Sequence, residues 1–247
     1  MSSPTPRARA GSHLAFALDY PDLPSAREGA TLVAPAVGVL KVGLELFVRG
    51  GAEAAAIGRV EGCELFLDLK LHDIPETVGR AVASAARYGA RYLTVHAAGG
   101  HAMLARAVEE ARNAPEPMTI LAVTVLTSLD EADLRAQGIG GTAREHVLRL
   151  AEGAWKAGVR GFVTSPAEAR ALREALGSEA YLVTPGIRPA GAASGDQKRV
   201  ATPADAIAAG ADLMVVGRPI RDAVSPREAA EALVAEIAGA LETVERR

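Results

Sequence analysis

The chain has 247 residues, a formal net charge of −3, 49% hydrophobic residues and 23% charged residues, a composition typical of soluble globular proteins. The small negative charge excludes a global basic field that would attract nucleic acid or an anionic membrane, so local groups must hold any anionic ligand. No apolar run approaches the roughly 18 residues or more that suggest a membrane-spanning helix.

The N-terminal sequence MSSPTPRARAGSH lacks the apolar segment of a secretory signal. The single cysteine, Cys63, cannot form an internal disulfide, and no Cys/His cluster has the spacing of a zinc site. We therefore expect a cytoplasmic protein without a metal site. We expect residues 1–12 to form a flexible tail. Residues 13–247 are expected to form one domain, because α/β barrels commonly have about 250 residues.

Eight short apolar runs follow one another along the chain, and each is nearly continuous rather than alternating. This pattern is typical of strands that are buried on both faces of a parallel sheet. The runs are His13–Asp19, Gly38–Gly43, Leu65–Leu71, Tyr92–Ala97, Thr119–Leu126, Gly161–Thr164, Tyr181–Pro185 and Leu213–Gly217.

Segments of helical character separate these runs. The clearest are Glu76–Tyr88, Ala102–Asn113, Thr142–Ala157, Pro166–Leu176 and, at the end, about Pro226 to Val244. Ser165-Pro166 and Thr202-Pro203 place a hydroxyl at the N-cap and a proline at the first helical position. Strict alternation of strand and helix predicts a parallel sheet, and eight repeats favour a closed α/β fold, the (β/α)8 barrel, over an open doubly wound sheet.

Charged residues gather where the predicted strands end. In a barrel of this type the catalytic groups lie at the carboxyl ends of the strands. Asp19 ends the first run, Lys41 lies in the second, and the third, FLDLKLHD, carries Asp68, Lys70 and Asp73. Alternate residues of a strand share a face, so Asp68 and Lys70 should point together into the barrel mouth. A buried ion-pair network that only positions strands is the alternative, but such a set of buried charges favours function over stability.

The loops after the seventh and eighth runs are predicted to bind phosphate. Loops at this position often grip phosphate in barrels that act on phosphorylated substrates. Glycine lets backbone N–H groups approach an anion, and arginine can make a bidentate contact. The candidates are Gly186, Arg188, Gln197, Gly217 and Arg218. The alternative is that these are turn glycines beside an arginine that faces solvent. If the loops do bind phosphate, we expect the loop 188–199 to fold over it.

Eight motifs together resemble, in order and spacing, those of the bacterial orotidine 5′-monophosphate decarboxylase family. They are FALDYP, LKVGLELF, FLDLKLHDIPETV, TVHAAGG, VTVLTS, VTPGIRP, GDQKR and MVVGRPI, and they extend from about residue 13 to about residue 225. The pattern D-x-K-x-x-D is shared with related barrels and is only moderately specific. The phosphate-loop motifs GIRP, GDQ and VGRPI make the combination much more specific.

The resemblance implies a role for each matching residue. Lys70 resembles the proton donor to the ring carbon that loses carbon dioxide, and Asp68 resembles the carboxylate beside the departing group. Asp19 and Lys41 resemble the groups that hold the ribose hydroxyls, and Lys41 also joins the charged array. Thr127 resembles the residue that meets the edge of the pyrimidine. The implied reaction converts orotidine 5′-monophosphate to uridine 5′-monophosphate, the last step of pyrimidine nucleotide synthesis.

The resemblance also implies a homodimer with shared sites. Asp73, Ile74 and Thr77 resemble residues that enter the active site of the neighbouring subunit. The implied phosphate grip consists of Arg188, Gln197, Gly217 and Arg218.

The implied chemistry uses no cofactor, so the protein itself must stabilise a ring carbanion electrostatically. Two other functions remain open at this point. One is a Mg2+-dependent decarboxylase or aldolase of the same barrel group that acts on a keto-sugar phosphate. The other is a nucleotide-binding barrel without catalytic activity. Turnover that survives a chelator would separate both from the implied reaction.

Overall fold

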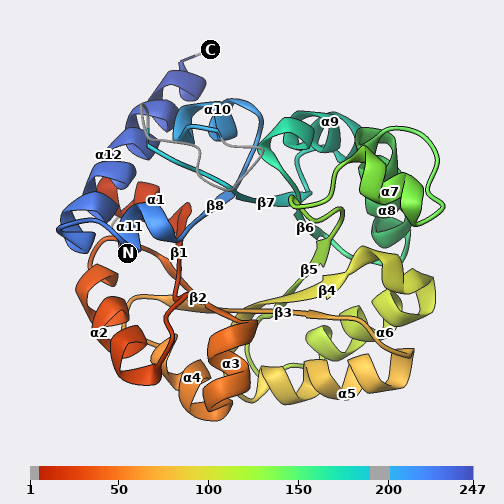
Figure 1. Cartoon of the computed structure of the whole chain (residues 1–247), viewed down its shortest axis with the longest axis horizontal. Coiled ribbons are helices and arrows are strands. Elements are labelled where there is room, and N and C mark those ends of the chain that lie inside the picture. The colour runs from red at the N-terminus through yellow and green to blue at the C-terminus, as the bar shows by residue number, and fades with distance from the viewer. Residues whose placement is uncertain (1–5, 190–200, 247) are drawn as a thin grey trace.

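The computed structural model describes residues 6–189 and 201–246. Eight parallel strands pair in sequence order, and β8 pairs back to β1, which closes the barrel (Figure 1). The strands are β1 (Leu14–Ala17), β2 (Val39–Gly43), β3 (Glu64–Leu71), β4 (Ala90–His96), β5 (Thr119–Val123), β6 (Gly161–Val163), β7 (Tyr181–Pro185) and β8 (Leu213–Val216). Each lies within, or overlaps, one of the eight predicted runs. The predicted (β/α)8 barrel is therefore confirmed, and the open sheet is excluded by the pairing of β1 with β8.

Helices surround the barrel as an outer ring (Figure 1). They are α1 (Pro6–Ser12), α2 (Leu23–Val33), α3 (Leu44–Gly50), α4 (Ala52–Ile57), α5 (Pro75–Ala86), α6 (Gly100–Arg112), α7 (Glu131–Ala136), α8 (Ala143–Lys156), α9 (Pro166–Leu176), α10 (Pro203–Ala208), α11 (Arg218–Arg221) and α12 (Pro226–Glu245). Thr202 caps α10 as predicted, because its hydroxyl accepts from the Asp205 amide. Ser165 occupies the N-cap of α9, but its side chain makes no capping hydrogen bond.

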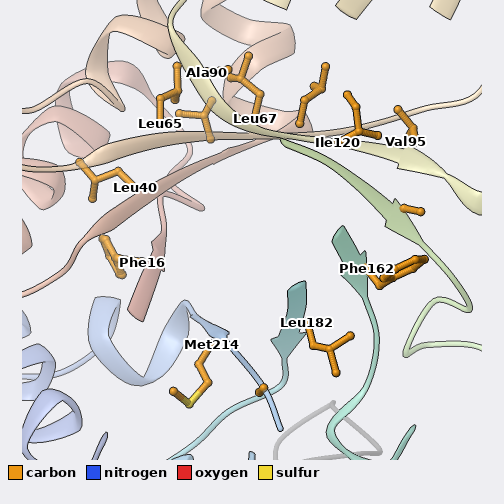
Figure 2. Packing of buried hydrophobic residues seen from close by; sticks show 14 of the residues in the cluster. Phe16, Leu40, Leu65, Leu67, Ala90, Val95, Ile120, Phe162, Leu182 and Met214 are labelled. Atoms are coloured by element: carbon orange, nitrogen blue, oxygen red, sulfur yellow. The ribbon is translucent and has the colours of Figure 1, made fainter. Parts of the chain in front are cut away.

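Two apolar layers hold the barrel together. The larger lies between strands and helices, where side chains such as Phe16, Leu67 and Phe162 extend outward from the strands (Figure 2). Burying one such side chain stabilises a fold by about 1.5–3 kcal/mol. The smaller layer fills the barrel interior and includes Phe66 and Tyr92. Alternation along β3 therefore directs Leu65 and Leu67 outward and Phe66 and Asp68 inward.

The N-terminal segment differs from the flexible tail predicted for residues 1–12. Pro6–Ser12 form the short helix α1, which packs against α12. Ala10 is completely buried, and Arg9 Nη1 lies 2.5 Å from Glu245 Oε1 of α12. The polar sequence PRARAGS shows no apolar periodicity, so this helix depends on a tertiary contact that local pattern does not reveal.

No helix within residues 6–189 and 201–246 is long and apolar enough to cross a membrane. The same described residues contain no group of three or more His, Cys, Asp or Glu side chains that could hold a metal ion.

Candidate active site

A cavity of about 270 Å³ opens at the carboxyl end of the barrel. Its volume is close to the lower end of the roughly 300–1,000 Å³ typical of ligand pockets. The cavity brings together residues that the sequence scatters over 200 positions. The predicted site residues on its wall are Asp19, Lys41, Asp68, Lys70, Thr127, Arg188, Gly217 and Arg218.

Four charged side chains alternate in sign along one wall of the cavity. Lys41 Nζ lies 3.5 Å from Asp19 Oδ1 and 3.4 Å from Asp68 Oδ2. Lys70 Nζ lies 2.7 Å from Asp68 Oδ1. Each residue comes from the carboxyl half, or just past the end, of β1, β2 or β3. The three neighbouring strands therefore build one continuous array in the order Asp19, Lys41, Asp68, Lys70.

Mutual pairing keeps the centre of this array ionised. Burial lowers the pKa of Lys41, but the adjacent Asp68 and Asp19 carboxylates outweigh it, so its pKa lies above the ordinary value. Burial likewise raises the pKa of Asp68, whereas Lys41, Lys70 and the hydrogen bonds from Lys70 and Thr94 bring it below the ordinary value. Both groups therefore carry their charges at neutral pH. Removing one partner would leave an uncompensated buried charge, which typically costs about 3–5 kcal/mol.

Lys70 has an unusual backbone. Its φ is 48°, and among the described residues it is the only one other than glycine that has a positive φ. The register between β3 and β4 shifts between Leu67 and Leu71, which marks an irregularity around Lys70. A left-handed conformation costs a residue with a Cβ about 1–2 kcal/mol. Asp68 and Lys70 meet as predicted, but through this distortion rather than through the regular alternation that the sequence analysis assumed.

Two residues that the sequence analysis passed over support the array. The Thr94 hydroxyl, on β4, donates to Asp68 Oδ1 at 3.0 Å and accepts from the Lys70 backbone N–H at 2.9 Å. A Cβ on Gly43 would lie 3.3 Å from Lys41 Nζ and 3.5 Å from Asp19 Oδ1, so glycine leaves room for their contact. The signal for Thr94 was its position two residues after Tyr92, on the inward face of the same strand.

Asp73, Ile74 and Thr77 do not line the cavity of their own chain. All three lie in the exposed stretch 72–77 that leads from β3 into α5. Ile74 exposes 66% of its surface, and the Asp73 carboxylate accepts a hydrogen bond from the Ile74 backbone N–H at 2.6 Å. A single chain therefore does not bring these predicted site residues to the charged array.

The part of the cavity wall that follows β7 and β8 carries the predicted phosphate-binding residues. Arg188 and Arg218 line it together with Gly186 and Gly217. Arg188 N–H donates to the Ala201 carbonyl at 3.0 Å, and the Ala201 amide donates to the Gly186 carbonyl at 3.3 Å. The buried Arg188 Nε has no hydrogen-bond partner among the described residues. Gln197 lies outside the described residues, as does most of the loop predicted to cover the phosphate.

Two histidines lie beside the array. The rings of His72 and His96 are 5.4 Å apart, centroid to centroid. Burial lowers the pKa of His96, and His72 and Lys70 lower it further, so His96 is neutral at pH 7. No contact among the described residues gives these two histidines a ligand role.

Comparison with known proteins identifies similar chains. Residues 12–233 match the family model described as "Orotidine 5'-phosphate decarboxylase / HUMPS family". An orotidine 5′-phosphate decarboxylase from Thermobifida fusca is 56% identical over 225 residues, which cover 91% of this chain and 95% of that protein. One from Anaeromyxobacter sp. (strain K) is 55% identical over 219 residues, covering 89% of this chain and 95% of the relative.

Solved structures are similar over nearly the whole barrel. The crystal structure of orotidine 5′-phosphate decarboxylase from Lactobacillus acidophilus gives a TM-score of 0.81 at 34% sequence identity, covering 92% of this chain and 99% of that one. An uncharacterized conserved protein from Geobacillus kaustophilus gives a TM-score of 0.79 at 33% identity, covering 91% of this chain and 99% of its own.

Proposed function

The chain belongs to the orotidine 5′-phosphate decarboxylase family, and from that premise we propose how its site converts orotidine 5′-monophosphate to uridine 5′-monophosphate. The reaction is the last step of uridine monophosphate synthesis and makes the protein a carbon–carbon lyase. The observation that carries the mechanism is the alternating array of Asp19, Lys41, Asp68 and Lys70 on one wall of the cavity.

The substrate lies across the cavity with its phosphate at one wall and its pyrimidine at the other. Arg188, Gly217, Arg218 and Gln197 hold the phosphate. Asp19 and Lys41 hold the ribose hydroxyls between the two ends. Thr127 meets the edge of the pyrimidine. The presence of both arginines and of Lys70 on the wall of one cavity supports this orientation.

Lys70 stabilises the developing charge and supplies the proton. The bond between the ring and the carboxylate breaks, the electron pair stays in an in-plane orbital of the ring carbon, and carbon dioxide leaves. The ring cannot delocalise this charge, so a fixed ammonium beside it provides electrostatic stabilisation. Lys70 Nζ donates its proton to the carbon, and solvent then restores the ammonium.

Asp68 acts on both partners of the reaction. Its contact of 2.7 Å with Lys70 Nζ holds the ammonium in place. Because the Asp68 carboxylate is itself ionised, it also repels the substrate's carboxylate before that group leaves. Lys41 balances the charge of Asp68 from the other side at 3.4 Å.

A second subunit completes the site. We propose a homodimer in which Asp73, Ile74 and Thr77 enter the cavity of the partner. Their exposure in the stretch 72–77 and their absence from the wall of their own cavity support this arrangement. An exposed isoleucine beside an exposed carboxylate is suited to a contact that buries one and presents the other.

The first test is turnover of orotidine 5′-monophosphate, followed by loss of ultraviolet absorbance, with EDTA present. We expect the wild type to be fully active, and Lys70→Ala to lose at least about 10⁴-fold in kcat, because it removes both the proton donor and the electrostatic stabilisation. Circular dichroism would verify that the variant is folded. No turnover by folded wild type, or turnover that requires Mg2+, would reject this proposal in favour of the keto-sugar phosphate chemistry.

A further inference from the structure

Thr94 makes two hydrogen bonds inside the barrel that no other described side chain duplicates. Its side chain is completely buried on β4. The hydroxyl donates its single hydrogen to Asp68 Oδ1 at 3.0 Å, the same oxygen that Lys70 Nζ contacts at 2.7 Å. The hydroxyl oxygen accepts from the backbone N–H of Lys70 at 2.9 Å. These contacts form a closed ring through Thr94, the Asp68 carboxylate, the Lys70 side chain and the Lys70 backbone.

The backbone of Lys70 needs such a partner. At φ 48° and at a register shift between β3 and β4, its amide leaves the regular ladder of strand hydrogen bonds. A buried amide without a partner is costly, so the Thr94 oxygen takes the place of the missing carbonyl. The left-handed conformation persists because surrounding contacts hold it.

We propose that Thr94 is a positioning residue for the decarboxylation. Its hydroxyl fixes the rotation of the Asp68 carboxylate and the strained backbone of Lys70 together, so that Nζ keeps one position beside the reacting carbon. Thr94 touches neither substrate nor reacting atoms, because it is absent from the cavity wall. The inference rests on the roles proposed above for Asp68 and Lys70.

Two variants separate the hydroxyl from the packing. Thr94→Val keeps the shape and removes both hydrogen bonds, whereas Thr94→Ser keeps the hydroxyl and removes only a methyl group. Thr124→Val is the matched control, because the buried Thr124 hydroxyl also makes a hydrogen bond at this end of the barrel, to the Val163 carbonyl at 3.0 Å, away from the charged array.

We expect Thr94→Val to lower kcat by about tenfold or more while KM changes less than about threefold, since the phosphate and ribose contacts are untouched. Thr94→Ser and Thr124→Val should stay within about threefold of the wild type in kcat. Equal losses in the Val and Ser variants, or an unchanged kcat in Thr94→Val, would overturn the proposal. If Thr94→Val does not fold, Thr94→Ala compared with Thr94→Ser answers the same question.

Crystal structures of the variants give a result that does not depend on turnover. We expect Lys70 Nζ to move away from Asp68 Oδ1, or Lys70 to leave the left-handed region, in Thr94→Val but not in Thr94→Ser. A wild-type arrangement of both residues in Thr94→Val would reject the positioning role even if the protein proves to catalyse another reaction. Lack of turnover by the wild type would reject the proposed function instead.

Discussion

The two ends of the barrel interior are built from the same strands but serve different purposes. At the amino end, Phe66, Tyr92 and Tyr181 pack against one another, and the stacked tyrosine rings are 5.7 Å apart. Two residues further along the same strands, at the carboxyl end, stand Asp68 and Thr94. One end therefore stabilises the fold, whereas the other keeps charges beside a cavity. This division lets the site tolerate charged and strained groups, because the packing at the other end compensates for them.

A buried tyrosine at the amino end and a buried aspartate at the carboxyl end differ in their ionisation. Burial raises the pKa of Tyr181, and the neighbouring Tyr92 and the carboxylates of Asp212 and Glu64 raise it further, so the phenol remains neutral. Asp68, at the other end, has its pKa lowered because two ammonium groups outweigh burial. A buried phenol thus stays neutral at the amino end, whereas a buried carboxyl group is ionised at the carboxyl end.

The largest expected effect concerns Asp73. It tests whether one chain alone forms a complete active site at the carboxyl end of the barrel. Asp73→Ala alone should lose about 10²-fold or more in kcat, because it removes a charge proposed to act in the partner's site. Mixing equal amounts of Lys70→Ala and Asp73→Ala subunits should restore roughly a quarter of the wild-type activity, since each mixed dimer has one intact site.

The control for this experiment is a mixture in which subunit exchange is prevented by omitting the dissociation step. Failure to recover activity after exchange has been verified by mass spectrometry would show that each chain uses its own Asp73. The active site at the carboxyl end would then be complete within a single subunit.

Arg218→Ala, on the part of the cavity wall that follows β8, should have the next largest effect. We expect kcat/KM for orotidine 5′-monophosphate to fall by about 10- to 100-fold, because a charge-assisted contact is lost. Arg227→Ala, which removes an exposed arginine paired with Glu231 on α12, is the control and should remain close to wild type. A loss below about threefold, or an equal loss with the nucleoside orotidine, would remove Arg218 from the phosphate site.

The smallest effect is expected at the amino end. Tyr181→Phe removes the hydrogen bond of 3.2 Å between the Tyr181 and Tyr92 hydroxyls. The free energy of unfolding, measured by urea denaturation, should fall by about 0.5–1.5 kcal/mol. Turnover should stay within about twofold of the wild type, because the site lies at the other end. A large loss of kcat with unchanged stability would break the division between the two ends.

The sequence predicted those features that depend on local pattern. Strands buried on both faces have nearly continuous apolar runs, and charges are rare in such runs, so Lys41, Asp68 and Lys70 were visible as exceptions. The left-handed backbone of Lys70 was not predictable, because it arises from how β3 pairs with β4. Thr94 was missed because threonine is common in strands, and only the fold places its hydroxyl beside Asp68.

Helix α1 and the exposure of Ile74 are two surface features that local sequence pattern also does not predict. Ala10 becomes buried only because α12 lies against it, and no periodicity in residues 6–12 indicates this contact. Ile74 is exposed in one chain, although an isoleucine before a helix is more often buried. Its position follows from the turn after β3, and its exposure is explained here only by the proposed partner.

A parallel β-bridge between Ile187 and Ala201 joins the residues after β7 to those before α10, beside the cavity. This bridge holds Gly186 and Arg188 in place, because the Arg188 N–H donates to the Ala201 carbonyl and the Ala201 amide donates to the Gly186 carbonyl. The position of Arg188 on the cavity wall therefore depends on Ala201, a residue that does not line the cavity itself.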